Sequence, residues 1–215
     1  YMKYIIANQK MKLNLQQVST WITEFDNLVQ YKNYDENKIR VIISPSYVFI
    51  PLFAKLSEKY SFVKICAQDV YDQLSGSYTG KVSITQVKDF CEYSIIGHTE
   101  TKNTTDQKIQ KTNLCLQNSV KPIICSDNPI QELSEFFSNN IDNNDFIDNV
   151  LVAYEDPTNI SKNGVYNEKP IDQVQKDIRL ISDNFKNINI IYGGSINENN
   201  VDKIANLQEL SGVLV

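Results

Sequence analysis

Short apolar runs recur along the chain at a fairly even spacing, and each is rich in isoleucine and valine. The eight runs are "YIIA" (4–7), "IRVIIS" (39–44), "FVKICA" (62–67), "YSIIG" (93–97), "KPIIC" (121–125), "NVLVAY" (149–154), "INIIY" (188–192) and "SGVLV" (211–215). Runs of this length and composition are typical of strands that are buried on both faces, as in parallel sheets. The pattern therefore predicts eight parallel strands.

The segments between these runs have a helical period instead. Residues 15–30 and 170–185 each carry five apolar side chains on one helical face, and Pro170 suits a first helical position. Weaker helical patterns occupy about 46–59, 85–91, 106–118, 130–138 and 198–207. The most polar stretch, "SNNIDNNDF" (138–146), is predicted to be a loop.

Strand and helix alternate throughout, and no linker or low-complexity tract divides the chain, so residues 1–215 are expected to form one domain. Eight strand–helix units favour a parallel (β/α)8 barrel. A doubly wound open sheet is the alternative. In both folds functional residues lie at the carboxyl ends of the strands, so the residues directly after each apolar run are the first candidates for a site.

Composition narrows the classes of partner. The net charge of −5 and the pI near 5.0 argue against nucleic acid or an anionic membrane, but not against a small anionic ligand. No apolar run approaches a membrane span, and no signal peptide is recognisable. Four cysteines without a C-x-x-C pair, and a single histidine, indicate reduced thiols and no metal site. We therefore expect a cytoplasmic protein.

Polar residues and glycines follow four of the predicted strands. Asn8 and Lys10 follow the first, His98 and Glu100 the fourth, Glu155 the sixth, and Gly193, Gly194 and Ser195 the seventh. Taken singly, each has a plain structural interpretation, since a lone histidine is more often structural and a Gly-Gly-Ser turn is merely a turn. Together, a carboxylate, an imidazole, a cation and a phosphate-sized nest on one barrel rim suit proton abstraction beside a carbonyl.

Seven motifs in this chain carry a family resemblance. They are "ANQKM" (7–11), "AQDVY" (67–71), "GSYTG" (76–80), "SIIGHTE" (94–100), "AYE" (153–155), "PIDQVQ" (170–175) and "YGGSINENN" (192–200). In this order and spacing the chain resembles the triosephosphate isomerase family over nearly its whole length. The resemblance implies a TIM barrel and an aldose–ketose isomerase of glycolysis and gluconeogenesis. Such an enzyme interconverts dihydroxyacetone phosphate and glyceraldehyde 3-phosphate without a cofactor.

The resemblance also implies a role for each candidate residue. Glu155 is expected to be the base that moves the carbon-bound proton, and His98 the neutral electrophile that polarises the carbonyl, its pKa kept low by a helix that follows "GHTE". Lys10 is expected to face the phosphate and the developing charge, Asn8 to orient the site, and Glu100 to support Lys10. The phosphate is expected to be bound by Ser161, Gly193, Gly194 and Ser195. The loop 67–83 implies a homodimer, with Thr79 reaching toward the partner's active site.

Three departures from the family pattern leave other functions open. The closing lid, "PVWAIGTG" in the family, is replaced by "DPTNISKNG" (156–164), in which Ser161 and Asn163 stand where the family has glycines. Two arginines after the histidine motif and a later "GE" are absent from "HTETKNTTDQ" (98–107) and "CSDN" (125–128), so the tie around the rim is expected to be missing. The chain stops at "GVLV", before the glycines and the final helix of the family, so we expect a barrel that lacks that helix, from a shortened or a compensated chain.

These departures keep two alternatives beside an active triosephosphate isomerase. One is a catalytically impaired or repurposed barrel that binds a phosphorylated ligand or a protein partner. The other is an isomerase for a different small sugar phosphate. The presence of Asn8, Lys10, His98 and Glu155 favours the active isomerase, since drift after loss of function is not expected to keep all four.

Overall fold

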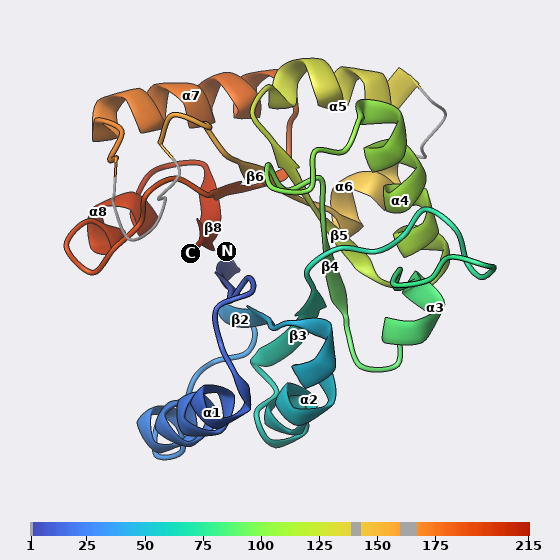
Figure 1. The fold of residues 1–215 in the computed structure, drawn as a ribbon. Helices are drawn as coiled ribbons and strands as arrows, with labels where there is room; N and C mark the ends of the chain where they lie inside the picture. The colour runs from blue at the N-terminus through green and yellow to red at the C-terminus, as the bar shows by residue number, and fades with distance from the viewer. Residues whose placement is uncertain (1, 139–142, 160–166) are drawn as a thin grey trace.

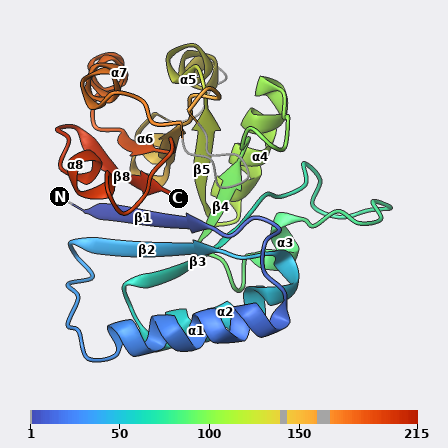
Figure 2. The ribbon, with the colours of Figure 1, turned by 60° about the vertical axis from the view of Figure 1, so that its left-hand side comes forward.

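The computed structural model describes residues 2–138, 143–159 and 167–215, and its strands close into one barrel. The strands are β1 (Lys3–Asn8), β2 (Ile39–Ser44), β3 (Val63–Ala67), β4 (Tyr93–Ile96), β5 (Lys121–Ser126), β6 (Leu151–Tyr154), β7 (Asn189–Tyr192) and β8 (Leu210–Leu214). Each strand is parallel to the next, and β8 is parallel to β1 (Figures 1 and 2). The predicted (β/α)8 barrel is confirmed, and the open sheet is excluded.

The barrel closes through a close approach of β8 to β1. Gly212 lies opposite Tyr4, and a Cβ atom at Gly212 would collide with the Tyr4 carbonyl oxygen, so only glycine fits there. Beyond the strand, Val215 N donates to Ile6 O and Asn8 N donates to Val215 O, both at 2.8 Å. These bonds continue the β8–β1 pairing up to the end of β1 that carries the first candidate residues.

The helices between the strands form an outer layer, which Figure 2 shows around the strands. They are α1 (Leu15–Val29), α2 (Ile50–Lys59), α3 (Ile84–Val87), α4 (Thr105–Gln117), α5 (Pro129–Ser138), α6 (Asn143–Asn149), α7 (Ile171–Asn184) and α8 (Val201–Ala205), with a 3₁₀ turn at Tyr47–Phe49 before α2. Two of the weaker helical patterns yield only short helices, α3 and α8. Pro170 is the residue that caps α7 rather than its first helical residue.

The prediction of a loop at 138–146 is wrong, because α6 occupies the second part of that stretch. The helix is held by one aromatic side chain: Phe146 is fully buried, and its ring centroid lies 5.8 Å from that of Phe136 and 5.1 Å from that of Phe137. A single buried phenylalanine among asparagines and aspartates gives almost no periodic signal, although its burial stabilises the helix by about 2 kcal/mol.

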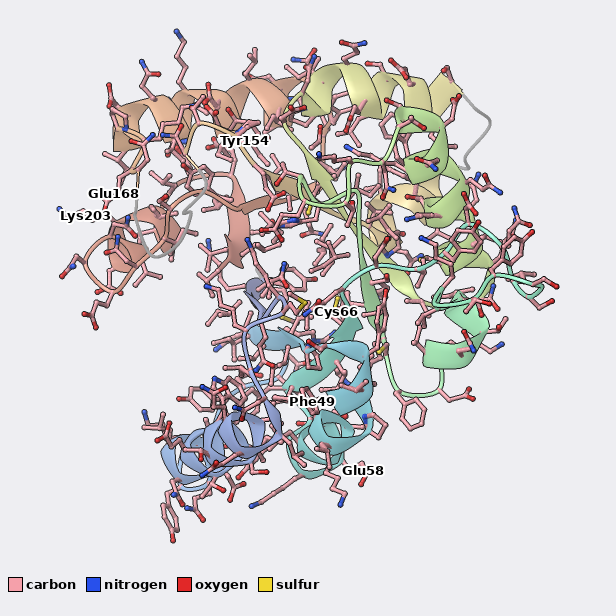
Figure 3. All side chains as sticks on the ribbon, viewed as in Figure 1. Phe49, Glu58, Cys66, Tyr154, Glu168 and Lys203 are labelled. Carbon is pink, nitrogen blue, oxygen red and sulfur yellow. The ribbon has the colours of Figure 1, made fainter. Side chains whose placement is uncertain are left out.

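Apolar side chains form separate layers inside and outside the sheet. The interior layer contains Ile6, Cys66, Ile95 and Ala153 among others, and Figure 3 places Cys66 near the centre of the view. Two larger clusters pack the outer face of the sheet against the helices. No helix in the described part of the chain combines the length and the apolar character needed to cross a membrane.

Candidate active site

The barrel brings the candidate residues of the first, fourth and sixth strands into one chain of contacts. Lys10 Nζ donates to Glu100 Oε1 at 2.8 Å, and His98 Nε2 lies 3.3 Å from Glu155 Oε1. Glu100 Oε2 lies 3.6 Å from His98 Nδ1 and joins the two pairs. Four of the residues predicted from the sequence are therefore neighbours in space at the carboxyl ends of the strands.

Lys10 occupies a backbone conformation that lysine rarely adopts. Its φ is +50°, in the left-handed region that costs an L-residue about 1 kcal/mol, and such strain is typical of functional sites. Three hydrogen bonds stabilise this turn: Lys10 N donates to Asn8 Oδ1 at 3.1 Å, and Lys10 O accepts from Ser46 Oγ at 3.0 Å and Gln68 Nε2 at 2.9 Å. Asn8 thus acts on Lys10 by holding the turn that aims it.

His98 is buried, with 4% of its surface exposed, and is held by the turn that follows it. Glu100 N donates to His98 Nδ1 at 3.2 Å, so the proton of a neutral imidazole lies on Nε2, the nitrogen that faces Glu155. Burial and, next, the charge of Lys10 lower the pKa of His98, against an opposing effect of Glu100. The imidazole is therefore a neutral donor, as expected from the family resemblance.

The expected source of that neutrality is wrong. No helix begins directly after "GHTE", because residues 99–101 form a turn and α4 starts only at Thr105, with Thr104 as its N-cap. Thr101 N and Thr101 Oγ1 both donate to His98 O at 2.8 Å, which fixes the turn. A helix dipole acts mainly within its first turn, so burial and Lys10 account for the lowered pKa instead.

Glu155 is the most enclosed ionisable group of the site, with 1% of its surface exposed. Burial raises its pKa from 4.5 to about 7, although hydrogen bonding to the Cys125 thiol, the charge of Lys10 and the Thr99 N–H oppose this rise. Its Oε2 atom has no hydrogen-bond partner among the residues that the structure describes. A carboxylate with a pKa near neutrality can both accept and return a proton.

The Gly-Gly-Ser turn after β7 lies against Glu155. A Cβ atom at Gly193 would stand 2.8 Å from Glu155 Cγ, and one at Gly194 would collide with the Tyr192 hydroxyl. A side chain at position 193 would therefore crowd the base, and one at position 194 would crowd Tyr192, reasons that the sequence did not reveal. The Ser195 hydroxyl is already engaged, since it donates to Asn159 O at 2.7 Å and accepts from Asn167 N at 3.0 Å.

Hydrogen bonds hold the described residues on the two sides of 160–166 to one another. Asp156 Oδ1 accepts from Thr158 N at 2.9 Å and from Thr158 Oγ1 at 2.7 Å, and Asn159 Nδ2 donates to Asn167 O at 3.0 Å. Asn167 Nδ2 also donates to Thr158 O. Ser161, predicted as a phosphate contact, lies outside the described residues, and so does Asn163.

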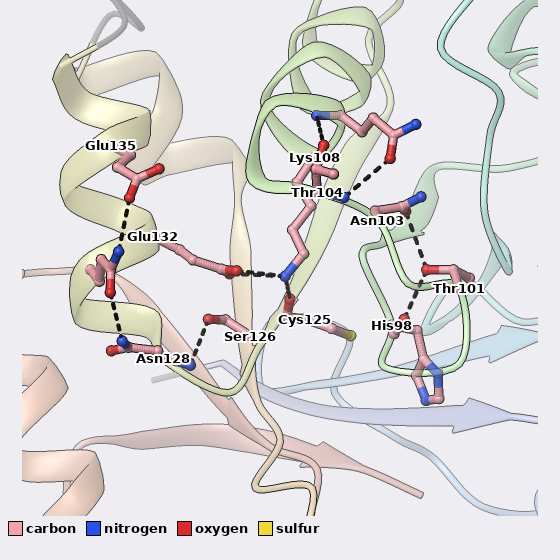
Figure 4. A network of polar contacts seen from close by, with 12 residues as sticks. His98, Thr101, Asn103, Thr104, Lys108, Cys125, Ser126, Asn128, Glu132 and Glu135 are labelled. Atoms are coloured by element: carbon pink, nitrogen blue, oxygen red, sulfur yellow. Dashed lines mark hydrogen bonds and ion pairs between the residues drawn. The ribbon is translucent and has the colours of Figure 1, made fainter.

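A buried lysine supplies the tie around the rim that was expected to be missing. Lys108, on α4, donates to both carboxylate oxygens of Glu132 on α5 and to Cys125 O, each at 2.9 Å (Figure 4). The same side chain fills the space beside Gly97, where φ is +72° and a Cβ atom would collide with it. Lys108 thus links the residue before His98 to the strand beside Glu155.

Sequence reasoning missed this lysine because Lys108 and Glu132 are far apart along the chain and form no recognisable motif. It also missed Cys125, whose thiol is fully buried beside the Glu155 carboxylate. The apolar run "KPIIC" gave no reason to separate Cys125 from its neighbours, and only the closed barrel places it next to Glu155.

A cavity of about 600 Å³ opens beside Lys10 and His98. Residues of the loop between β3 and α3 line its other side, including Tyr71, Gly80 and Lys81. This loop extends away from the barrel in Figures 1 and 2, and it carries Thr79, which is exposed. Thr79 does not line the cavity that contains Lys10.

The arrangement is suited to moving a proton between neighbouring carbons of a small anionic substrate. A carboxylate with a pKa of about 7 faces a neutral imidazole donor, and the Lys10 ammonium group pairs with Glu100, which lies beside the Nδ1 atom of that imidazole. Among the described residues, no cluster of three or more histidine, cysteine, aspartate or glutamate side chains could hold a metal ion.

Comparison with known proteins identifies the family of the chain. The sequence profile of the triosephosphate isomerase family matches residues 3–215. The triosephosphate isomerases of Mycoplasma genitalium and Mycoplasma capricolum are each 31% identical to this chain, with 99% of this chain and 91% and 92% of their own lengths aligned. That of Malacoplasma penetrans is 29% identical over 99% of this chain and 92% of its own length. By fold, site and sequence, the chain belongs to the triosephosphate isomerase family.

Proposed function

We propose that this protein interconverts dihydroxyacetone phosphate and D-glyceraldehyde 3-phosphate by proton transfer through an enediolate. The observation that carries the proposal is the pair formed by Glu155 and His98, a carboxylate whose pKa is raised to about 7 against a neutral imidazole at 3.3 Å. The family membership and the names of the relatives support the same reaction.

Glu155 takes the proton from the carbon beside the substrate carbonyl, and His98 Nε2 donates a hydrogen bond to the oxygen on which charge develops. A neutral donor matches the proton affinity of an enediolate better than an imidazolium would, which favours a shared proton. Glu155 then returns the proton to the neighbouring carbon. Because its pKa is close to neutrality, both half-reactions are near balance at pH 7.

Lys10 stabilises the negative charge of the phosphate and of the enediolate, and Glu100 keeps its ammonium group on the side of His98. The backbone N–H groups of Gly194 and Ser195 bind the phosphate, in the way that glycine-rich turns bind anions. The Ser195 hydroxyl has a different task, since its two hydrogen bonds hold the segment after Glu155 against this turn.

The test is a coupled assay that follows dihydroxyacetone phosphate formed from glyceraldehyde 3-phosphate by the purified protein. Glu155→Gln keeps the shape of the side chain and removes the base, so we expect a fall in kcat of at least about 1,000-fold. His98→Gln should lower kcat by about 100-fold. A folded wild-type protein without activity, or a Glu155→Gln variant with wild-type activity, would refute the proposal.

We also propose that the enzyme works in the cytoplasm, in glycolysis and gluconeogenesis, as a single-domain subunit of a homodimer. The exposed loop that carries Thr79 and the cavity beside Lys10 support a dimer in which the loop of each protomer enters the cavity of the other. Analytical ultracentrifugation should give twice the 24.7 kDa chain mass for the wild type. Thr79→Arg should shift the distribution to the single chain mass, and an unchanged distribution would contradict this arrangement.

A further inference from the structure

Lys169 is the centre of a half-buried ionic cluster that no part of the reaction described above uses. Its Nζ atom lies 2.6 Å from Asp177 Oδ2, 3.0 Å from Asp156 Oδ2 and 3.0 Å from the Tyr154 hydroxyl, and it sits over the Tyr154 ring at 5.3 Å from the centroid. The Tyr154 hydroxyl donates to Asp177 Oδ2 at 3.1 Å. The Lys169 side chain is 12% exposed, and its two carboxylate partners are half-buried.

Two of its partners are the residues on either side of Glu155 in the chain. Side chains alternate between the faces of a strand, so the neighbours of an inward-facing residue point outward. Tyr154 belongs to the cluster that packs the outer face of the sheet, whereas Ala153 and Glu155 face the interior. Figure 3 shows Tyr154 close to α7. Lys169 therefore binds the side chains of both residues that flank the base, on the outer side of the sheet.

The third partner supplies the fixed point. Asp177 lies in the second turn of α7, a helix whose buried face packs against the sheet through Val174, Ile178 and Ile181. The ion pair between Lys169 and Asp177 consequently ties the end of β6 to a rigid element. Hydrogen bonds to Asp177, Tyr154 and Asp156 raise the pKa of Lys169 despite its burial, so it stays protonated while the enzyme works.

The contacts of the Glu155 carboxylate are uneven between its two oxygen atoms. Its Oε1 atom is 3.3 Å from His98 Nε2, and its Oε2 atom has no hydrogen-bond partner among the described residues. In the family pattern a proline follows the base directly, whereas this chain has Asp156, which provides the carboxylate that Lys169 binds. With one carboxylate oxygen unpartnered, the position of the base depends on its backbone as well as on its carboxylate contacts.

The geometry points to Lys169 as a positioning residue, which holds Glu155 in its reactive place through Tyr154 and Asp156. This inference rests on the proposed isomerase function for its kinetic readout, but its structural readout does not. A base displaced by about 1 Å from its substrate can lose about 100-fold in rate. The loss of rate should appear in kcat rather than in KM. Lys10 and the Gly-Gly-Ser turn, the groups proposed to bind the phosphate, are not part of the cluster.

The kinetic test compares two lysines that are similarly buried in ion pairs at opposite ends of the barrel. Lys169→Met should lower kcat by at least 10-fold and change KM by less than about 3-fold. Lys64→Met is the matched control, because Lys64 pairs with Glu92 at 2.6 Å near the amino ends of the strands. It should change kcat by less than about 2-fold, and Lys169→Arg, which keeps the charge, should recover most of the lost kcat.

If Lys169→Met does not fold, Asp156→Asn replaces it in the comparison. The asparagine keeps an acceptor for Thr158 but loses the negative charge that Lys169 binds, so kcat should fall in the same way. Equal kcat values for the Lys169→Met or Asp156→Asn variant and for the Lys64→Met control, at matched folded fractions, would overturn the inference.

A second readout needs no activity, because His98 is the only histidine in the chain. In protein with ¹⁵N-labelled histidine, the Nε2 signal of His98 should show an inflection near pH 7 as Glu155 ionises beside it. The other groups facing Glu155, namely Lys10, Glu100 and the Cys125 thiol, are the same in every variant. Lys169→Met or Asp156→Asn should reduce this inflection, and Lys64→Met should preserve it.

The two readouts separate the inference from the proposed function. An inactive wild-type protein refutes the isomerase, while the His98 titration of the variants still decides whether Lys169 positions Glu155. An inflection that is identical in the wild type, the Lys169→Met variant and the Asp156→Asn variant would overturn the inference, whatever the activity of the wild type.

Discussion

The buried base should make the folded protein less stable as the pH rises, and Glu155→Gln should abolish that loss. The pKa of Glu155 is raised from 4.5 to about 7, so the folded state binds the proton more tightly than the unfolded state does. The stability that this proton contributes is fully present below pH 4.5 and is lost as the pH rises through 7. A shift of this size corresponds to about 3 kcal/mol in the free energy of unfolding.

Glutamine does not ionise. When the pH is raised from 4.5 to 8, the free energy of unfolding of Glu155→Gln should therefore rise by about 3 kcal/mol relative to that of the wild type. The change with pH is the quantity to measure, because the buried glutamine amide adds a cost of about 1–3 kcal/mol that is the same at both pH values. The pKa of His98 is lowered in both proteins, so its contribution to the free energy of unfolding cancels when the two are compared.

Urea unfolding at matched protein concentration, at pH 4.5, 6, 7 and 8, measures the difference. Glu58→Gln is the control, since Glu58 is exposed on α2 (Figure 3) and the same chemical change there should alter the free energy of unfolding by less than about 0.5 kcal/mol at every pH. A difference between Glu155→Gln and the wild type that stays constant within about 1 kcal/mol over this range would refute the reasoning.

Two further substitutions test the surroundings of the base. Gly193→Ala places a methyl group 2.8 Å from Glu155 Cγ, so kcat should fall at least about 10-fold. The free energy of unfolding should fall by only about 1–3 kcal/mol. An unchanged kcat would contradict the close approach. Lys108→Met leaves the Glu132 carboxylate buried without its cation, so the free energy of unfolding measured with urea should fall by about 3–5 kcal/mol. Adding Glu132→Gln should recover part of this loss. A loss below about 1 kcal/mol would argue against the tie.

The barrel was predictable because its signal is local. Every strand is a short apolar run, and both long helices have a clear apolar face, so alternation alone indicates eight strand–helix units. The helix α6 was not predicted, because one buried side chain, Phe146, anchors a segment that is otherwise polar. Periodicity cannot report a helix that tertiary contacts stabilise through a single residue.

The active site was predictable only in part, for a related reason. His98, Glu100, Lys10 and Glu155 each follow a strand, and a parallel barrel must bring the carboxyl ends of its strands together. No such rule predicts the positions of the residues that support them. Lys108 pairs with Glu132 on α5, and Lys169 pairs with Asp156 after β6 and with Asp177 on α7. The spacing of Lys169 from Asp156 and Asp177 matches no recurrent motif.

The measurement that tests the central claim most directly is the pH profile of kcat/KM for the isomerisation. If Glu155 is the base, kcat/KM should be level near pH 8 and should fall below an apparent pKa of about 7. The substrate phosphate, with its second pKa near 6, should steepen the fall further. At pH 6 the value should lie at least about 10-fold below its plateau. A profile that stays level from pH 8 to pH 6.5 would contradict the assignment of a raised pKa to the catalytic base.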